Sequence, residues 1–481
     1  MSFNVKPTNE CLPPGWKLTT LGESCRVLAG FGFPERLQGR TQGEIPFFKV
    51  GDISAVWKRN ERFLNDAKHY ISYADASSIR ARPLPANTIV FAKIGAAIAL
   101  NRRAMLGTAA LVDNNIMGLS PSFDNLDARF LFHYVCTLKL DELSRATTVP
   151  SVRKSDIENI SLPLPPVFEQ RCIVAEIEKQ FTRLDAGVAS LKRVQAALKR
   201  YCASVLKAAC EGRLVATEAE LARKEGRSYE PATELLTRIL RQRRTEWESV
   251  RAAKCQTTGK GQYEETRTPE VSGEALAMLP EGWTWASLGQ LIGYLRNGIS
   301  TKPDAEDGLP ILRISAVRPL SVNLSDVRFL GESQNNFADY LLANGDLLFT
   351  RYNGNPELVG VCAMVHGLTY PLVHPDKLIR AKLVSPGALP SFVSVVANVG
   401  ISRRYLAKRV RTTAGQAGIS GGDLKGIPIP LPPSAEQKRI VEEVERRISV
   451  IVEIEATVKA NLKRAERLRQ SILHRAFTGN L

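Results

Sequence analysis

The sequence predicts an α+β protein with two globular domains of mixed helices and strands, joined by long helices that form an antiparallel coiled coil. Three observations predict this fold: an internal duplication, β-rich runs mixed with helical spacing in each copy, and two long stripes of apolar residues at coiled-coil spacing. Because the second half repeats the first, we expect the copies to be related by a pseudo-two-fold axis, with the domains at opposite ends of the helices.

The duplication is visible in two short blocks that recur at one spacing. Leu-Pro-Pro-Gly-Trp at 12–16 returns as Leu-Pro-Glu-Gly-Trp at 279–283, which is 267 positions later. Pro-Leu-Pro-Pro followed by Glu-Gln, at 163–170, returns at 430–437 with the same offset of 267. Between these blocks the copies diverge strongly. One scaffold therefore carries two different surfaces.

Each divergent region has the pattern of a small mixed domain. The expected strands are 45–53 and 88–94 in the first copy and 310–317 and 346–351 in the second, and 126–143 has helical spacing. We align Ala86-Asn87 with Ala343-Asn344, because each pair comes before one of these strands. The two copies are thus expected to share a fold.

A long helix is expected after each divergent region. Apolar residues there recur in steps of three and four, which is typical of a coiled-coil seam. The seam positions are Ile177, Leu184, Leu191 and Leu198 in the first helix and Val444, Ile451, Val458 and Leu468 in the second. The first helix would be about 65 Å long. We interpret the stripes as a structural seam between the two helices, which would then act as a spacer.

The ends of the long helices carry their own signals. Ser434 with Gln437 three residues later predicts a capping box at the start of the second helix. Val167 stands at the corresponding place in the first helix, so that start is expected to be less well capped. Gly212 and Gly479 are expected to end the two helices.

These signals divide the chain into five segments. They are a globular domain at 1–166, a central helical region at 167–256 with a long helix at 169–211 and a shorter amphipathic helix at 231–250, a polar linker at 257–278, a second globular domain at 279–433, and a C-terminal long helix at 434–481.

The composition indicates a polyanionic partner. The formal net charge is +16 and the pI is about 9.5. Clustered Lys and Arg gain affinity by releasing counterions from phosphates, so nucleic acid is favoured. A membrane is not, because no run approaches the roughly 20 apolar residues that span a bilayer. With no apolar leader at its start, the protein is expected in the cytoplasm.

Catalytic and metal-site patterns are missing from the sequence. The eight cysteines include no Cys-x-x-Cys pair, and the five histidines form no His-Glu-x-x-His arrangement. We therefore expect no metal site, and we interpret the cysteines as reduced, structural thiols.

Four motifs in this order resemble the specificity subunit of Type I restriction-modification enzymes. They are the repeated Leu-Pro-x-Gly-Trp, the strand-like Ile-Pro-Phe-Phe-Lys-Val-Gly-Asp-Ile at 45–53, Leu-Leu-Ala-Asn-Gly-Asp-Leu-Leu-Phe-Thr-Arg at 341–351, and Pro-Leu-Pro-Pro with Glu-Gln leading into a long helix. Each motif alone is weak. Their order, duplicated at one offset, is specific, and the resemblance covers almost the whole chain.

The resemblance implies two target-recognition domains, each reading one half of a bipartite, asymmetric site in double-stranded DNA. It also implies that the helices set the spacer and dock two modification (methyltransferase) subunits, joined in some complexes by two restriction subunits. S-adenosylmethionine, ATP and Mg would then be bound by these partners, with no cofactor on this chain. The chain would be a non-catalytic subunit of a complex with adenine-N6 methyltransferase and ATP-dependent endonuclease activity.

Candidate DNA-binding residues are basic, amide and aromatic side chains near the ends of the expected strands. They are Lys49, Lys93, Arg102 and Arg103 in the first domain and Arg313, Arg351, Tyr352, Asn353, Arg403 and Arg404 in the second. Arg forks onto guanine and Asn onto adenine, whereas Lys more often contacts phosphate. For any single member a solvated surface charge is the alternative interpretation.

Two rival functions remain open from the sequence. One is a fused restriction or methylation enzyme that acts alone, which would need a cofactor or metal motif. The other is a stand-alone coiled-coil scaffold that binds DNA or only proteins, with its positive charge serving solubility.

Overall fold

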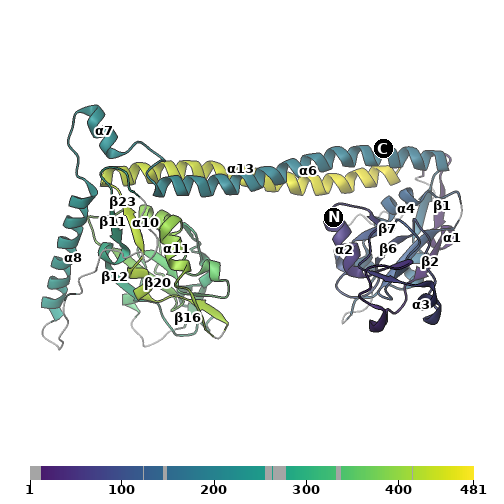
Figure 1. The fold of residues 1–481 in the computed structure, drawn as a ribbon, viewed down its shortest axis with the longest axis horizontal. Helices are drawn as coiled ribbons and strands as arrows, with labels where there is room; N and C mark the ends of the chain where they lie inside the picture. Colours follow the sequence, from purple (N-terminus) through teal and green to yellow (C-terminus); the bar gives the residue numbers. More distant parts are fainter. Residues whose placement is uncertain are drawn as a thin grey trace. The chain divides into compact units, whose positions relative to one another are not determined.

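The computed structural model describes residues 12–122, 124–144, 149–254, 263, 278–331, 337–413 and 415–481. It divides into two compact units. Module 1 comprises residues 1–193 and 458–481, and module 2 comprises residues 194–457. Each module combines one globular domain with the start of one long helix and the end of the other (Figure 1). The predicted mixed fold class is confirmed. Of the predicted linker 257–278, only Tyr263 and Met278 lie within the described residues.

The domain of module 1 is built on a five-stranded sheet of order β2-β9-β6-β7-β4 and a three-stranded sheet of order β5-β3-β8. Its strands are β1 Lys17–Thr20, β2 Cys25–Ala29, β3 Ile45–Phe48, β4 Phe63–Leu64, β5 His69–Ile71, β6 Ile89–Ala92, β7 Arg103–Leu106, β8 Leu111–Val112, β9 Ile116–Pro121 and β10 Ser161–Leu164. Its short helices are α1 Leu21–Ser24, α2 Val50–Lys58, α3 Tyr73–Ser78, α4 Ala128–Val135 and α5 Lys154–Glu158. The central strand β6 is buried at every position.

The domain of module 2 repeats the centre of this plan in a four-stranded sheet of order β12-β20-β17-β19. Its strands are β11 Thr284–Ser287, β12 Ile292–Asn297, β13 Leu309–Leu312, β14 Val317–Arg318, β15 Ser321–Val322, β16 Val327–Leu330, β17 Leu347–Thr350, β18 Tyr352–Asn353, β19 Cys362–Met364, β20 Leu378–Leu383, β21 Arg411–Thr413, β22 Gln416–Gly418 and β23 Pro428–Leu431. Its short helices are α9 Leu288–Leu291, α10 Pro390–Ala397, α11 Gly400–Ala407 and α12 Gly421–Lys425. A separate sheet of order β18-β22-β21 lies beyond the end of β17.

The strand predicted at 45–53 is wrong in its second half. Strand β3 ends at Phe48, and helix α2 begins at Val50. The side chain of Asp52 accepts a hydrogen bond from the backbone N–H of Lys49 at 2.8 Å, which stabilises the first turn of the helix. The carboxylate thus overrides the β preference of the neighbouring apolar residues.

The alignment of Ala86-Asn87 with Ala343-Asn344 is also wrong, by one position. Asn87 donates to the carbonyl of Leu106, and the residue that makes the equivalent bond in module 2 is Gly345, which donates to the carbonyl of Val365. Both residues have a positive φ, 63° for Asn87 and 91° for Gly345. Glycine and asparagine tolerate that backbone region best, and the shared turn aligns β6 with β17.

The two long helices are α6, Val167–Cys210, and α13, Ser434–Phe477, with 44 residues each. They run antiparallel within each module (Figure 1). In module 1, Ile177 and Phe181 of α6 share a core cluster with Ile472 of α13. In module 2, Val205 of α6 shares one with Val444 of α13. The predicted helix and its seam are therefore observed, and Gly212 and Gly479 follow the helices with φ of 65° and 71°.

Most predicted seam positions are covered, but Leu468 is not. Ile177, Val444, Ile451 and Val458 are buried, and Leu184, Leu191 and Leu198 are half-buried. Leu468 is 49% exposed, and the seam position is taken by Arg469. The Arg469 guanidinium lies 4.4 Å from the ring centroid of Phe181 and pairs with Asp185. Steps of three and then four residues from Leu462 lead to Ala465 and Arg469. The prediction chose Leu468 because it is hydrophobic, although it lies one position away from this period.

A hydrogen-bonded joint ties each globular domain to the helix that follows it. We call it the Trp–Glu joint, formed by Trp16 and Glu169 in module 1 and by Trp283 and Glu436 in module 2. The indole Nε1 of the Trp donates to Oε1 of the Glu, at 2.8 Å in module 1 and 2.9 Å in module 2. The repeated sequence blocks therefore contact each other. The strands that directly follow the first block, β1 and β11, pair antiparallel with β10 and β23, which lead into the second block.

The glutamine after each joint glutamate completes the attachment. The side chain of Gln170 accepts from the backbone N–H of Asp127 and donates to the carbonyl of Pro165, each at 2.8 Å. Gln437 repeats this, accepting from Leu389 at 2.8 Å and donating to Pro432 at 3.0 Å. The predicted capping box is therefore wrong, because the side-chain oxygen of Gln437 accepts from Leu389 in the domain and not from a backbone N–H at the helix start. This role needs no Ser at position 434, which explains why Val167 suffices in the first copy.

The helix that ends in each module packs on that module's proline-rich first block. A Cβ added to Gly212 would lie 2.4 Å from Cγ of Pro280, and one added to Gly479 would lie 2.1 Å from Cγ of Pro13. The positive φ and the close approach both require glycine here. Each globular domain is thus held by the start of one long helix and the end of the other.

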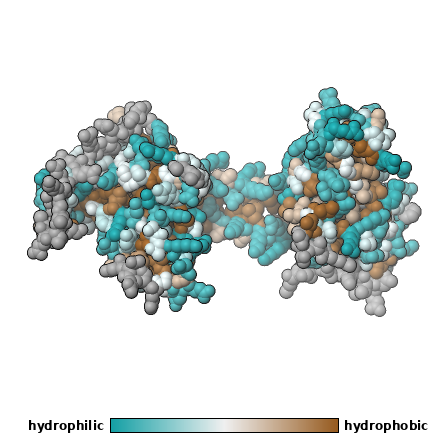
Figure 2. Space-filling model, turned by 90° about the horizontal axis from the view of Figure 1, so that it is seen from below, coloured by the Kyte–Doolittle hydropathy of each residue, from teal (hydrophilic) through white to brown (hydrophobic). Residues whose placement is uncertain are grey.

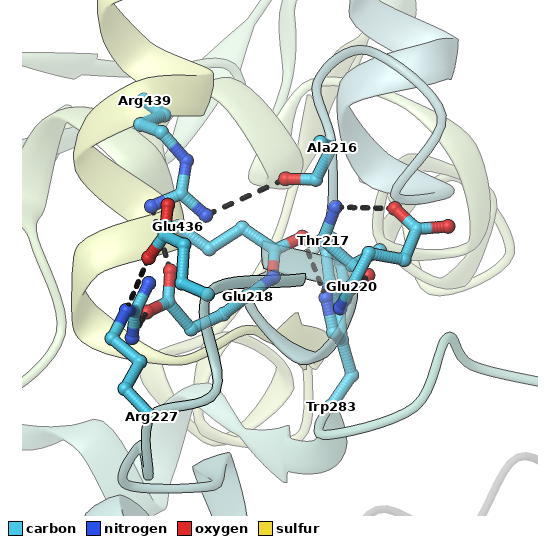
Figure 3. A network of polar contacts seen from close by, with 9 residues as sticks. Ala216, Thr217, Glu218, Glu220, Arg227, Trp283, Glu436 and Arg439 are labelled. Carbon is cyan, nitrogen blue, oxygen red and sulfur yellow. Dashed lines mark hydrogen bonds and ion pairs between the residues drawn. The ribbon is translucent and has the colours of Figure 1, made fainter. Parts of the chain in front are cut away.

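Module 2 has an additional clamp made by the segment between α6 and β11. Helix α7, Glu218–Glu225, begins over the joint, where the backbone N–H of Glu218 donates to Oε2 of Glu436 at 2.8 Å. Glu218 in turn pairs with Arg439 and Arg227, each at 2.6 Å (Figure 3). Helix α8, Ala232–Lys254, then packs on the domain, close to the predicted 231–250.

Burial distinguishes the two joints electrostatically. Glu436 has no exposed surface, and this burial raises its pKa above the ordinary value despite the hydrogen bonds from Glu218 and Trp283. Glu169 in module 1 is half-buried. If the tryptophan donor is lost, water can replace it at Glu169, which is partly exposed, but not at Glu436, which is buried.

We predict that Trp283→Phe destabilises module 2 more than Trp16→Phe destabilises module 1. Both changes remove one indole N–H and similar packing, but only Glu436 is left fully buried, at a cost of about 1–3 kcal/mol. Hydrogen exchange of the full chain in increasing urea, resolved by peptide, measures both modules at once. Equal losses in the two modules would contradict the proposed importance of burial.

Candidate nucleic-acid interface

The predicted base-reading residues of module 2 lie at the end of the central strand β17. Arg351 follows that strand, and Tyr352 and Asn353 form β18, which pairs with β22. The guanidinium of Arg351 lies 4.7 Å from the ring centroid of Tyr352. The predicted trio is therefore brought together at one place, which we call strand-exit site 2.

Strand-exit site 2 contains a cavity that is lined largely by polar and charged residues. A cavity of about 410 Å³ is lined by Arg351, Tyr352, Arg411, Gln416 and Asp423, among others. Arg411 and Gln416 are exposed on the hairpin β21–β22. A Cβ added to Gly418 would lie 2.4 Å from Cδ1 of Tyr352, so the absence of a side chain there lets the ring lie over β22.

Sequence reasoning missed Arg411 and Gln416. A signal was available: Arg-Thr-Thr at 411–413 and Gln-Ala-Gly at 416–418 flank Gly415, which is the pattern of a tight hairpin. Nothing in that pattern places the hairpin beside Tyr352, because the pairing joins residues more than 60 positions apart. Long-range pairing of this kind has no local signature.

Two of the predicted arginines are structural. Arg103 is 2% exposed, and its guanidinium donates to the backbone carbonyls of Asn101 and Leu138. Burial lowers its pKa below the ordinary value. The guanidinium of Arg403 donates to the carbonyls of Val359, at 2.6 Å, and Glu357, and burial lowers its pKa as well. We correct both assignments, because these guanidinium groups are engaged by backbone carbonyls of neighbouring loops.

The other candidates are placed in separate surroundings. Lys49 directly precedes α2, and its Nζ donates to Oε1 of Gln38 at 2.6 Å. Lys93 follows β6 and is half-buried, as is Arg102. Arg313 is paired with Asp326 at 3.5 Å, and Arg404 is exposed on α11. Lys93 occupies the position in module 1 that corresponds to Arg351.

Acidic and sulfur ligands do not gather around these sites. Among the residues that the structure describes, no three His, Cys, Asp or Glu side chains are placed to hold a metal ion. In the same residues, no helix combines the length and apolar character needed to cross a membrane.

Comparison with known proteins identifies the family. The family model described as the Type I restriction modification DNA specificity domain matches residues 13–200. Residues 13–200 thus form a domain of this family, and the second copy repeats the same blocks and joint.

The chain is similar to the Type I restriction enzyme EcoKI specificity subunit of Escherichia coli (strain K12), with 32% identity over 75% of this chain and 66% of that protein. It is 26% identical to the Type I restriction enzyme StySPI specificity subunit of Salmonella potsdam, over 71% of this chain and 62% of that protein. The matched parts thus span less than two thirds of each relative. A solved structure concerned with complex assembly and conformational transition of the type I R-M system matches 98% of this chain and 99% of its own, with a TM-score of 0.63 and 18% identity. That likeness shows the fold.

We predict opposite effects for two arginines that the sequence presents as equivalent. Arg103→Met leaves buried carbonyls without donors and destabilises module 1 by about 3 kcal/mol, while folded protein keeps its DNA affinity. Arg351 is half-buried, and its hydrogen bond to the carbonyl of Asp376 is long, at 3.4 Å. Arg351→Met is therefore expected to cost less stability than Arg103→Met and to weaken DNA binding about tenfold. Urea unfolding and fluorescence anisotropy with duplex DNA measure the two quantities. The assignment fails if Arg103→Met selectively weakens DNA binding at full stability.

Proposed function

We propose that this chain is the DNA-recognition subunit of a Type I restriction-modification complex, in which each globular domain reads one half of a bipartite, asymmetric site. The observation that carries this proposal is the duplication of one family scaffold with two divergent surfaces. The joints and central sheets repeat, while the residues at the strand ends differ. Two different readers on one chain fit a site with two different halves.

The surface chemistry supports a polyanionic ligand. The chain has a net charge of +16. Hydrophilic residues cover much of the face of each globular domain seen in Figure 2, with small hydrophobic areas between them. Protein–DNA interfaces are more polar and more positively charged than interfaces between proteins, so such a face suits DNA.

The long helices would set the spacer and dock the modification subunits. Besides the covered seam, α13 has apolar side chains directed to solvent: Val450 is 47% exposed, Val452 58% and Ile454 39%. Val450 and Ile454 lie one turn apart on the same face of α13, and exposed apolar residues that share a helix face favour an additional protein partner. Two modification subunits, joined in some complexes by two restriction subunits, are the partners we infer.

The chemistry would belong to these partners. S-adenosylmethionine for adenine methylation, and ATP with Mg for translocation and cleavage, are assigned to the partner subunits in this proposal. This chain would contribute recognition and geometry alone, and would work on double-stranded DNA in the cytoplasm.

Salt dependence separates a DNA reader from a protein-binding scaffold. We expect log affinity for duplex DNA to fall linearly with log salt, with a slope of about −0.9 for each phosphate neutralised, hence about −5 for six contacts. Fluorescence anisotropy from low to physiological salt gives this slope. A flat response, with the protein folded throughout, would contradict the proposal.

Shortening the helices should change the spacer alone. Removing one heptad from the middle of both α6 and α13 shortens them by about 10 Å, which corresponds to about three base pairs. Mapping of methylated adenines in the host DNA should reveal unchanged half-sites separated by a shorter spacer. Altered half-sites at an unchanged spacing would show that the helices do not act as the ruler.

A further inference from the structure

The backbone around strand-exit site 2 has a counterpart in module 1. After β17, the N–H of Arg351 donates to the carbonyl of Lys377 at 2.8 Å, and its carbonyl accepts from Ile419 at 3.0 Å. After β6, the N–H of Lys93 donates to the carbonyl of Asn115 at 2.9 Å, and its carbonyl accepts from Val152 at 2.9 Å. The same pair of bonds fixes both segments.

The next residues continue the correspondence. Tyr352 pairs with Gly418 in module 2, and Ile94 is bridged to Ser151 in module 1. Ser151 and Gly418 are separated by the same 267 positions as the repeated blocks, and so are Val149 and Gln416. We call the module 1 counterpart strand-exit site 1, formed by Lys93, Ile94, Val149 and Ser151.

The two sites present opposite chemistry at equivalent backbone positions. Site 2 has the exposed amide of Gln416 and the half-buried aromatic ring of Tyr352. Site 1 has Val149, which is 55% exposed, and Ile94, which is 38% exposed. Each keeps one cation, Arg351 or Lys93, directly after the central strand.

Base edges in the major groove match these two chemistries. Arg and Gln form paired hydrogen bonds with purines, using N7 together with O6 of guanine or N6 of adenine. Apolar side chains instead contact the C5-methyl group of thymine. An amide and a guanidinium therefore suit purines, while Val and Ile suit thymine.

We propose that the strand-exit sites are the equivalent base-reading elements of the two modules, with Gln416 and Arg351 reading purines through N7 and Val149 and Ile94 reading thymine through its methyl group. This inference rests on the proposed function and adds the chemistry by which each half-site is read. It also explains how one scaffold acquires a new half-site: exchange of a few side chains leaves the backbone bonds intact.

Modified bases test the proposal with the wild-type protein. The probe is the duplex motif obtained by mapping methylated adenines, with the full chain bound to its modification partner. Replacing thymine by deoxyuridine removes only the C5-methyl group, and we expect binding about fourfold weaker in one half-site, as for one buried methyl. Replacing purines by 7-deazapurines removes N7, and we expect at least fivefold weaker binding in the other half-site only.

Single substitutions show which module is responsible for the response to each modified base. Val149→Ala should reduce the sensitivity to deoxyuridine, and Gln416→Ala should reduce the sensitivity to 7-deazapurines. Val250→Ala, at a residue on α8 that is 54% exposed, is the matched control and should keep both. Thermal unfolding verifies that each variant is folded.

The outcomes separate this inference from the proposed function. If the wild-type complex marks a bipartite motif but neither half-site responds to the modified bases, or the variants respond as wild type does, the inference is overturned and the recognition role stands. If no motif is marked and no duplex is bound, with the partner folded, the proposed function itself fails.

Discussion

The hydrogen bond between a tryptophan and a glutamate is the interaction on which the rest of this structure depends. In both modules it closes a loop of more than 150 residues, because Trp16 and Trp283 reach Glu169 and Glu436 at 2.8 and 2.9 Å. The adjacent strand pairs and the glutamine after each glutamate complete the attachment. These contacts hold the globular domain that lies between the two blocks at the start of a long helix. They do not depend on which side chains the domain carries on its surface.

This arrangement separates what must be kept from what can vary. The joint, the central strand with its positive-φ turn and the two backbone bonds after that strand recur in both copies. Gln416 and Val149 lie close to those bonds in sequence, but their side chains are exposed. They can therefore differ between the copies without loss of the fold. Module 2 also has the clamp of α7 on Glu436, which is formed by the segment that follows the first long helix. It adds burial, and therefore rigidity, to one joint.

Sequence reasoning predicted the duplication, the long helices and their seam because each leaves a periodic or repeated trace along the chain. It failed where neighbours share a chemical type but not an environment. Arg102 and Arg103 look alike in sequence, yet one is half-buried and the other is a core residue that donates to backbone carbonyls. The prediction also placed Leu468 in the seam because leucine is hydrophobic. The helical period places Arg469 there instead, and its guanidinium packs on the ring of Phe181. The hairpin beside Tyr352 depends on long-range pairing, which only the folded chain reveals.

The most direct test of two different readers on one scaffold is the motif that the chain specifies. The chain would be expressed with its modification partner, and methylated adenines would be mapped across the host genome. The account predicts one bipartite, asymmetric motif with two unlike half-sites and a constant unread spacer. A single undivided motif, or two identical half-sites, would contradict it.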